Sequence, residues 1–393
     1  MMQQYDVIII GGYGHIGLPM GIVLADTDLQ VGLYDIDKSK EPLISAGKMP
    51  FLEYDSEPIL QRTIGKTLHL VGDISEVANA KTIVITIGTP LDEYLNPKLR
   101  PMFSLAESLL PHLHNDHHII LRSTVYPRTS ERLYDFFCKH HLSVHLAFCP
   151  ERIAQGYAIR ELHKLPQIIS GFTPEALHLS RTLFERLGQE IVEVEVLEAE
   201  MAKLFSNAWR YLQFSIANQF YMMAEENGVD FYRIHHAMTY GYERAQDFPR
   251  AGFAAGPCLL KDTMQLSAFH QNNFMLGHSA MLINEGLPAF IVNQLLEQYD
   301  LKQETVGILG MAFKANVDDI RDSLSYKLGK LLRFHGANVL YTDEFAQDPT
   351  FISKEELVRR SSIVVVGVPH SNYRGLEIPE HVHLVDIWGF FKK

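Results

Sequence analysis

The chain has 393 residues, of which 47% are hydrophobic and 21% charged, a length that can bury two or three separate cores. Its formal net charge of −12 excludes a general nucleic-acid or anionic-membrane surface, which requires clustered positive charge, but allows a small anionic ligand in a local basic pocket. No apolar stretch approaches the roughly 20 residues that a bilayer crossing requires, and we interpret the opening apolar run as a buried strand rather than a signal peptide.

The three cysteines, Cys138, Cys149 and Cys258, are widely spaced and form no CxxC pair. This pattern favours neither a disulfide framework nor a structural zinc site, and it is typical of a protein in a reducing cytoplasm. The histidine-rich stretch HLHNDHH at residues 112–118 lies between a helical segment and a strand. We therefore expect a solvated turn there and no metal site.

The first strand is expected at Tyr5–Ile10, because a continuous apolar run is typical of a parallel strand covered on both faces. A glycine-rich turn follows, and then a helical pattern with Pro19 in its first turn. Further strands are expected at residues 30–35, 82–88, 118–124 and 143–150, separated by helical segments. This alternation predicts a doubly wound parallel sheet over residues 1–195.

The pattern changes near residue 196, from where apolar residues recur at helical spacing as far as Gly228. Residues 196–300 are predicted to form an all-α domain, and its long helix is a candidate seam for a homodimer. Strands return at residues 304–310, 337–343, 361–369 and 383–389, so residues 301–393 repeat the first arrangement. The expected fold class is α/β, with two Rossmann-like doubly wound domains flanking a central all-α domain.

The first turn reads Gly12-Tyr-Gly14-His-Ile-Gly17, and Asp35 ends the next strand. We expect Gly12 to permit the tight turn, Gly14 to let the backbone approach a pyrophosphate, and Gly17 to allow close packing of helix on strand. The helix N-terminus then offers free N–H groups to the phosphates. An acid at Asp35 would bond ribose hydroxyls and repel a 2′-phosphate, so the motif predicts NAD rather than NADP. A tight turn that binds nothing is the alternative.

Three further motifs fall where strands are expected to end, and ligands of open α/β sheets bind at that edge. GTPLDE places Thr89 there, RSTVYP places Thr124, and CPERIAQG places Glu151. Each motif has an ordinary alternative, since such turns are common and an exposed glutamate is usually only solvated.

Lys203 and Asn207 are four residues apart on the long helix and therefore share one face. They are either the solvated side of that helix or paired donors directed at a developing oxyanion, and the spacing alone leaves both readings open.

Cys258 and Asp262 are also four apart, and they share a face if Gly256-Pro257 opens a helix. The helix dipole would then stabilise a Cys258 thiolate, and Lys261 would add positive charge. We interpret Cys258 as a reactive thiol, with a packing cysteine as the alternative.

Together these motifs resemble the UDP-glucose/GDP-mannose dehydrogenase family, NAD-dependent enzymes that oxidise a nucleotide sugar at C6 to a uronate. The resemblance covers nearly the full length. The motifs that carry it, in the family's order, are GGYGHIGLP, GTPLDE, STVYP, CPERI, AKLFSNAWR, AGPCLLKD and GMAFKANVDDIRDS.

The resemblance implies a role for each matching position. Cys258 would be the nucleophile, with Lys203 and Asn207 as polarising donors. Asp262 would assist the lysine or a water, while Thr124 and Glu151 would hold and activate the water. The resemblance lines the NAD site with Gly12, Gly14, His15, Ile16, Gly17, Asp35, Thr89, Thr124 and Arg321. It lines the substrate site with Glu151, Lys203, Asn207, Gly256 and Lys314, and with Arg244 from a neighbouring subunit.

The expected activity is a four-electron oxidation, because taking an alcohol to an acid needs a covalent handle as well as a base. The sugar is expected to be UDP-glucose or a UDP-N-acetylhexosamine, since Gln155 stands where some glucose-specific relatives carry a second glutamate. One alternative is a two-electron hydroxyacid-type NAD dehydrogenase, which would not need a third α/β domain. Another is a non-catalytic sensor that binds NAD without turnover.

Overall fold

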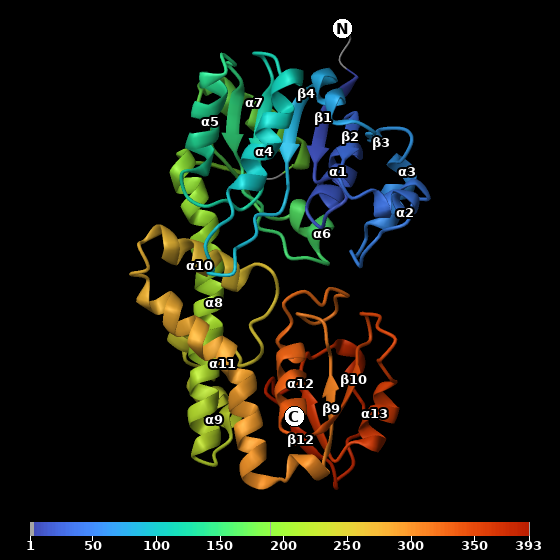
Figure 1. Ribbon diagram of the computed structural model, residues 1–393, viewed down its shortest axis with the longest axis vertical. Helices are drawn as coiled ribbons and strands as arrows, with labels where there is room; N and C mark the ends of the chain where they lie inside the picture. The colour runs from blue at the N-terminus through green and yellow to red at the C-terminus, as the bar shows by residue number, and fades with distance from the viewer. Residues whose placement is uncertain (1–3, 189, 393) are drawn as a thin grey trace. The chain divides into compact units, whose positions relative to one another are not determined.

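The computed structural model describes residues 4–188 and 190–392 (Figure 1). The chain divides into unit 1, Met1–Ser206, and unit 2, Asn207–Lys393. Both units contain parallel sheets with helices, and a long helix runs between them in sequence. The expected α/β fold class is therefore confirmed, whereas the predicted domain limits after residues 195 and 300 stay a prediction.

Unit 1 contains a six-stranded sheet in the order β3-β2-β1-β4-β5-β6, in which all neighbours are parallel. Its strands are β1 Tyr5–Ile10, β2 Val31–Tyr34, β3 Leu68–Leu70, β4 Ala80–Ile85, β5 His118–Leu121 and β6 His145–Phe148. Its helices are α1 Gly17–Ala25, α2 Glu41–Ser45, α3 Glu57–Thr63, α4 Arg100–Leu109, α5 Thr129–Lys139, α6 Ala158–Leu162 and α7 Pro174–Phe184. A separate parallel pair consists of β7 Gln167–Ile169 and β8 Ile191–Glu193. This strand order is that of a dinucleotide-binding fold.

Alternate residues of β1 enter two different cores, because successive side chains of a strand point to opposite faces. Val7 and Ile9 pack with residues of α1, α6 and α7. Ile8 and Ile10 pack with residues of α4 and α5. The sheet is thus covered on both faces, which explains why its strands read as continuous apolar runs.

The strands end earlier than the sequence predicts. The strand expected at 118–124 ends at Leu121, and the one expected at 143–150 ends at Phe148. Thr124 and Glu151 therefore lie in the loops that follow their strands, at the edge where such sheets bind ligands.

The solvated turn expected at residues 112–118 is only partly correct. Residues 114–116 are exposed, but His117 and His118 are buried, because β5 begins at His118. The His118 ring contacts Thr82 Oγ1 at 3.2 Å and Ser180 Oγ at 3.0 Å. Burial lowers the pKa of His118 to about 3, so this histidine is a neutral core residue.

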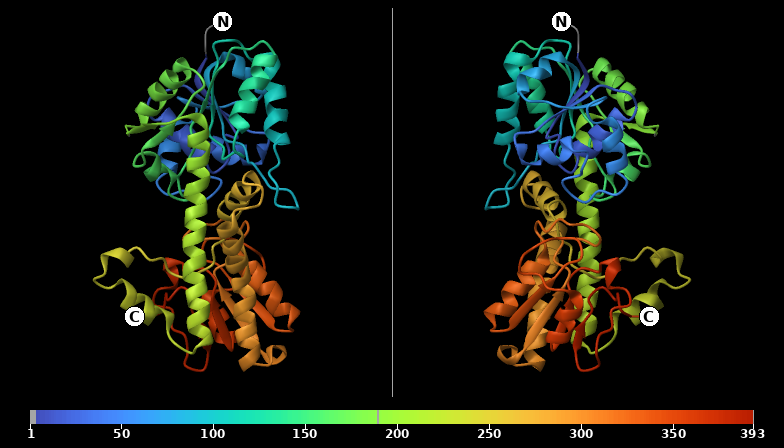
Figure 2. Two further views of the ribbon diagram at one scale, coloured as in Figure 1. Left: turned by 90° about the vertical axis from the view of Figure 1, so that its left-hand side faces the viewer. Right: turned by 90° about the vertical axis from the view of Figure 1, so that its right-hand side faces the viewer.

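The long helix α8, Val196–Glu226, is uninterrupted over 31 residues, as the sequence predicts (Figure 2). It begins in unit 1 and ends in unit 2. None of the helices within the described ranges combines the length and apolarity of a membrane span.

Unit 2 contains a four-stranded parallel sheet in the order β10-β9-β11-β12. Its strands are β9 Thr305–Leu309, β10 Asn338–Thr342, β11 Ile363–Val366 and β12 His383–Val385. Its further helices are α9 Phe231–Thr239, α10 Leu259–Phe269, α11 Met275–Gln298, α12 Leu324–Phe334 and α13 Lys354–Arg360. Val306 and Ile308 of β9 pack with α8, α11 and α12, whereas Leu309 packs with α13.

A pair of buried asparagines fixes the segment that leads to Cys258. Asn218 of α8 donates from Nδ2 to Gly252 O at 3.0 Å and to Asn284 Oδ1 at 2.9 Å, and Gly252 N donates back to Asn218 Oδ1 at 2.8 Å. Asn284 of α11 donates to Tyr211 O at 3.0 Å. Both asparagines are fully buried, so their partners have no water to replace these bonds.

We expect Asn218→Ala to destabilise unit 2, because Gly252 would lose partners for both its N–H and its C=O. Leaving buried polar groups unpaired costs about 1–3 kcal/mol each, so the variant should lose at least about 2 kcal/mol. The unfolding midpoint in urea measures this. Asn227→Ala, at an exposed residue near the end of the same helix, is the matched control and should unfold like the wild type. Equal unfolding midpoints for the two variants would contradict this stabilising role of Asn218.

Candidate active site

The glycine turn after β1 is shaped by close contacts. Gly11 has a φ of +82°, and at Gly12 a Cβ would lie 2.9 Å from Ile9 O, so both positions of this tight turn favour glycine. At Gly17 a Cβ would lie 2.3 Å from Gly11 O, which confirms that this position allows close packing of helix on strand. Thr86 fixes the turn by donating from Oγ1 to Ile10 O at 2.9 Å.

The start of α1 presents backbone donors next to this turn. Ile16 precedes the helix, and no side chain among the described residues caps its first N–H groups. At Gly14 a Cβ would lie 3.3 Å from Gly11 O, so a larger residue would crowd the turn. An anion fits such a helix end, because unpaired N–H groups and the helix dipole both favour it. These residues fit the pyrophosphate of a dinucleotide.

Asp35 lies directly after β2, beside the glycine turn. Its Oδ2 accepts from Tyr13 N at 3.0 Å and its Oδ1 accepts from Asp37 N at 3.0 Å. The residue is half-buried, so the carboxylate is held in place yet reaches the surface. The position fits an acid that bonds the hydroxyls of a ribose. His15, in the same turn, stacks its ring on Phe51 with centroids 3.9 Å apart.

The loops after β4 and β5 are tied to each other. Thr89 donates from Oγ1 to Thr124 O at 2.5 Å. Ser123 donates from Oγ to Ile87 O at 2.7 Å. The structure thus brings both predicted threonines together at the carboxyl edge of the sheet.

Glu151 is a buried residue rather than a solvated one. Arg122 Nη2 donates to its Oε2, while its Oε1 accepts from Arg152 N at 2.7 Å and from Ile153 N at 3.0 Å. Arg122 is itself fully buried, with Nη1 on Cys149 O at 3.1 Å. Arg122 was not predicted, and its place in the motif RSTVYP two residues before Thr124 is the one signal that could have indicated it.

The three cysteines occupy different environments. Cys149 is buried, and this burial raises the pKa of its thiol to about 11. Cys138 is exposed in the last turn of α5. Cys258 is exposed and directly precedes α10, at the end of the helix where the dipole favours a thiolate. Of the three, the position of Cys258 best fits a reactive thiol.

One turn further along α10, the buried carboxylate of Asp262 links two donors. Asn207 Nδ2 donates to its Oδ2 at 2.5 Å, and Lys261 Nζ donates to its Oδ1 at 2.6 Å. Asn207 is also buried, which rules out the solvated-face reading for this residue. Lys261, expected to add positive charge beside the thiol, pairs with Asp262. Lys203 is half-buried one turn before Asn207 on α8.

The loop between β9 and α12, residues 310–323, carries Lys314 and Arg321. Lys314 is half-buried, whereas Arg321 is exposed and donates from Nη2 to Asp319 at 2.6 Å. This hydrogen bond is the main cause that raises the pKa of Arg321, and a smaller contribution comes from Cys258. Gly256, with a φ of +98°, donates its N–H to Asp322 O at 3.2 Å.

Arg244 lies on an exposed turn, Glu243–Ala245, that follows α9. No group of three or more His, Cys, Asp or Glu side chains in the described ranges is arranged to hold a metal ion. Thr86, Arg122 and Asp319 were not predicted from the sequence, because their hydrogen bonds to Gly11, Glu151 and Arg321 are visible only in the fold.

We expect the protein to bind NAD more tightly than NADP, because Asp35 presents a negative charge where NADP carries its 2′-phosphate. Asp35→Ala should weaken NAD binding and reduce the difference in affinity between NAD and NADP. Titration calorimetry with both ligands measures the two affinities. Asp37→Ala, at the exposed acid two residues on, is the matched control and should keep the preference. A wild-type preference for NADP would overturn the role of Asp35.

The comparisons with known proteins agree with this geometry. Models of the UDP-glucose/GDP-mannose dehydrogenase family match residues 6–188 (NAD-binding domain), 197–285 (central domain) and 307–393 (UDP-binding domain). The chain is 26% identical over 382 residues to the UDP-N-acetyl-D-mannosamine dehydrogenase of Methanocaldococcus jannaschii, covering 94% of this chain and 87% of that protein. It is 25% identical to the NDP-N-acetyl-D-galactosaminuronic acid dehydrogenase of Ralstonia nicotianae, covering 95% and 93%.

Among solved structures, the UDP-glucose dehydrogenase of Pyrobaculum islandicum aligns with a TM-score of 0.90 at 24% identity, covering 99% of this chain and 94% of that one. This likeness supports the fold. The match to the family's NAD-binding domain identifies NAD as the cofactor and the protein as an NAD-dependent oxidoreductase. The chain belongs to the UDP-glucose/GDP-mannose dehydrogenase family.

Proposed function

We propose that this chain oxidises a UDP-linked sugar at C6 to the uronate, in two oxidations joined by a thioester on Cys258. The observation that carries the proposal is an exposed cysteine at the N-terminus of α10, one turn before a buried Asp262 that is bonded to Asn207. NAD, when bound, supplies the hydride acceptor for both oxidations.

The covalent step explains why the site needs a thiol. The first oxidation gives an aldehyde at C6, and the Cys258 thiolate adds to it to form a thiohemiacetal on Sγ. Loss of a second hydride from this adduct leaves a thioester. Water then cleaves the C–S bond and returns the thiol. Overall, one alcohol, one water and two NAD⁺ give one carboxylate, two NADH and three protons.

Asn207 is proposed to stabilise the oxyanion of these adducts. Its Nδ2 has two hydrogens, and one is directed at Asp262. The second is the donor that we assign to the oxyanion, with the Lys203 ammonium as a further donor from the same helix face. Asp262 holds the amide in this orientation, so it acts in the proposal as a positioning residue.

Thr124 and Glu151 are proposed to handle the water that cleaves the thioester. Both follow strands at the carboxyl edge of the unit 1 sheet. Arg122 and two backbone amides hold the Glu151 carboxylate, so its direction is set by the fold.

The free cysteines of the chain further support the reducing cytoplasm expected from the sequence.

A UDP-N-acetylhexosamine is the substrate class that we favour. The UDP-binding domain match supports the nucleotide, and two relatives are named for N-acetylated sugars. Gln155 lies near the nucleotide turn, with its Nε2 3.5 Å from His15 Nε2. Some glucose-specific relatives carry a second glutamate at this position. The neutral amide of Gln155 therefore favours a substrate other than UDP-glucose.

Replacing the nucleophile should separate the two oxidations. We expect Cys258→Ser to lower uronate formation by at least about 1000-fold, because a serine alkoxide is not available near neutral pH. The first oxidation should persist, so an O-substituted hydroxylamine should trap the aldehyde. Mass spectrometry of the products, with UDP-N-acetylmannosamine and UDP-glucose as substrates, measures the uronate and the trapped aldehyde.

Cys138→Ser, at the other exposed cysteine, is the matched control and should make uronate at the wild-type rate. A Cys258→Ser protein that forms uronate at a comparable rate would rule out the thioester.

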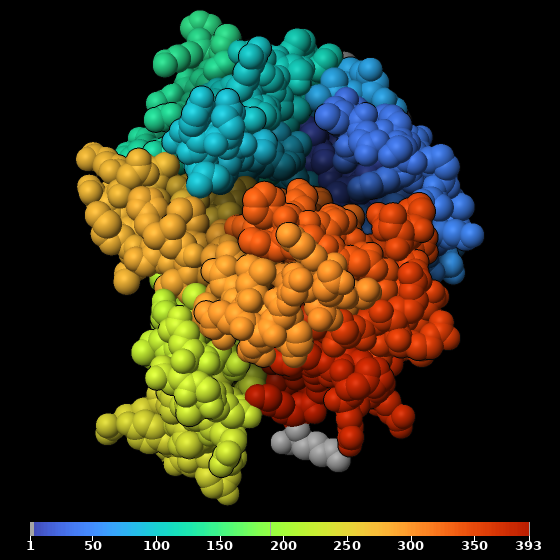
Figure 3. Space-filling model, turned by 60° about the horizontal axis from the view of Figure 1, so that its bottom comes forward, coloured from blue at the N-terminus to red at the C-terminus, as the bar shows by residue number. Residues whose placement is uncertain are grey.

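We also propose a homodimer that pairs α8 of two chains. Trp209, Ile216 and Met223 follow each other at intervals of seven residues and are 58%, 41% and 52% exposed. Phe220, 41% exposed, lies on the same face. This part of α8, yellow-green in Figure 3, reaches the molecular surface. An apolar stripe with this spacing is the pattern of a helix that packs on another helix.

We expect the wild-type protein to sediment as a dimer at micromolar concentration and Met223→Glu to shift it toward monomer. A charge within an apolar helix seam is left unpaired and costs several kcal/mol. The matched control is Phe334→Glu, at an 83% exposed aromatic on α12. A monomeric wild type, or a dimer that Met223→Glu leaves intact, would contradict this interface.

A further inference from the structure

The carboxyl edge of the unit 2 sheet repeats the nucleotide turn of unit 1. Gly310 follows the first strand with a φ of +93°, as Gly11 does with +82°. Asp343 follows the second strand, as Asp35 does, and likewise accepts from the backbone of that turn. The two sheet edges therefore share one local architecture. The contacts in which they differ indicate the role of this turn in unit 2.

The main difference is that more donors reach the carboxylate of Asp343 than that of Asp35. The Asp343 side chain has no exposed surface. Oδ2 accepts from Met311 N at 2.7 Å and Ala312 N at 2.9 Å, and Oδ1 accepts from Phe345 N and Ala346 N at 2.8 Å. Backbone N–H groups of two loops thus donate to both oxygens of this carboxylate. A ribose bound as in unit 1 would have to displace them.

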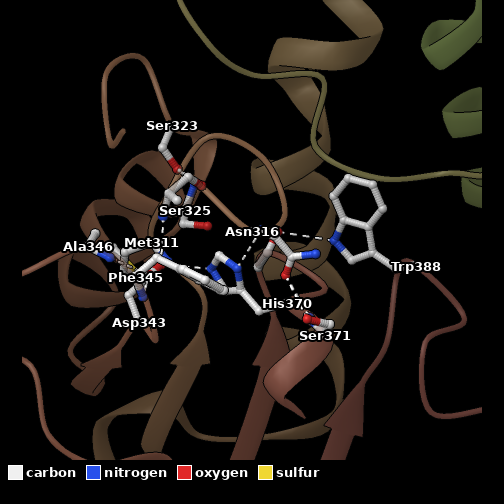
Figure 4. A network of polar contacts seen from close by, with 12 residues as sticks. Met311, Asn316, Ser323, Ser325, Asp343, Phe345, Ala346, His370, Ser371 and Trp388 are labelled. Atoms are coloured by element: carbon white, nitrogen blue, oxygen red, sulfur yellow. Dashed lines mark hydrogen bonds and ion pairs between the residues drawn. The ribbon is translucent and has the colours of Figure 1, made fainter. Parts of the chain in front are cut away.

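A fifth donor comes from a third loop. His370, fully buried after β11, donates from Nε2 to Asp343 Oδ2 at 3.0 Å, as Figure 4 shows. Its Nδ1 accepts from Asn316 N at 2.9 Å. Since a backbone N–H only donates and a carboxylate only accepts, the ring must be neutral with its proton on Nε2. Burial alone would raise the pKa of Asp343, but the hydrogen bonds from His370 and the backbone amides lower it.

Asn316 is held on two sides by the same loop. Besides its N–H bond to His370, its Oδ1 accepts from Ser371 N at 2.9 Å and Ser371 Oγ at 3.0 Å (Figure 4). Asn316 has a φ of +60°, a left-handed conformation that asparagine tolerates better than most residues. His370 and Ser371 thus fix the middle of the 310–323 loop, two residues after Lys314.

The far part of this loop contacts the cysteine segment. Asp322 O accepts from Gly256 N at 3.2 Å, and a Cβ at Gly256 would lie 2.5 Å from the Phe313 ring. Phe313 N in turn donates to Asp319 O at 2.9 Å within the loop. Gly256 precedes Cys258 by two residues. A continuous chain of contacts therefore runs from His370 through the 310–323 loop to the nucleophile's own segment.

We propose that His370, with Asp343, is a positioning residue that fixes the 310–323 loop and so couples binding of the substrate's nucleotide to the placement of Cys258. The proposal rests on the proposed function, in that the nucleotide is the UDP of a sugar substrate bound by unit 2. His370 acts through Asn316 and does not itself touch the reacting atoms.

The test compares two binding affinities and one chemical rate in the full-length protein. Titration calorimetry measures UDP and NAD separately, and iodoacetamide labelling followed by peptide mass spectrometry measures the alkylation rate of Cys258. His370→Phe keeps the ring but loses both hydrogen bonds. His370→Asn retains an acceptor near the position of Nδ1 for the Asn316 N–H. His383→Phe, the same change at a half-buried histidine of β12, is the matched control.

We expect His370→Phe to weaken UDP binding about tenfold or more and to change the alkylation rate at least about threefold, since small displacements of positioning groups have large effects. NAD affinity should fall less than UDP affinity, because the residues expected to line the NAD site lie in unit 1 except for Arg321. His370→Asn should fall between this variant and the wild type, and His383→Phe should match the wild type. Unchanged UDP binding in His370→Phe, or equal losses of UDP and NAD affinity, would overturn the proposal.

Failure of the proposed function has a different signature. A wild-type protein that binds UDP but reduces no NAD with any nucleotide sugar would reject that function, while the binding comparison would still decide the role of His370. A wild-type protein that binds no UDP would overturn both.

Discussion

The buried carboxylate of Asp262 is the constraint on which the active-site region of unit 2 depends. It is 1% exposed, and a charge so enclosed is stable only when partners satisfy it. Asn207 and Lys261 both donate to it, which fixes an amide on α8 against the first turn of α10. Removing one partner of such a buried charge costs about 3–5 kcal/mol, so the fold and the donor geometry are maintained by the same contacts.

The two parallel sheets show how one local architecture serves two purposes. In both, a left-handed glycine follows the first strand and an aspartate follows the second. In unit 1 the aspartate lies beside an uncapped helix start, which suits a dinucleotide. In unit 2, His370 and the backbone enclose the aspartate, and the loop it holds instead supports the segment of Cys258. His370, after the third strand, is the side chain that joins the backbone donors to this aspartate.

Much of this fold could be predicted because parallel strands covered on both faces are continuous apolar runs, and β1, β9 and α8 begin within a residue of the expected positions. The glycine motif and Asp35 were predictable for a similar reason, since their spacing is set by the turn itself. Residues whose importance comes from long-range pairing were not. Arg122 meets Glu151, and Asn218 meets Gly252, across sequence separations that no local pattern encodes.

The account as a whole depends on a four-electron oxidation at Cys258, and the ratio of NADH formed to nucleotide sugar consumed tests this most directly. Each of UDP-glucose, UDP-N-acetylglucosamine, UDP-N-acetylgalactosamine and UDP-N-acetylmannosamine would be converted to completion by the wild-type protein, with NADH followed by absorbance and the sugar by chromatography. The account predicts two NADH for each molecule of the accepted sugar. A ratio of one, with an aldehyde or ketone as the final product, would contradict it.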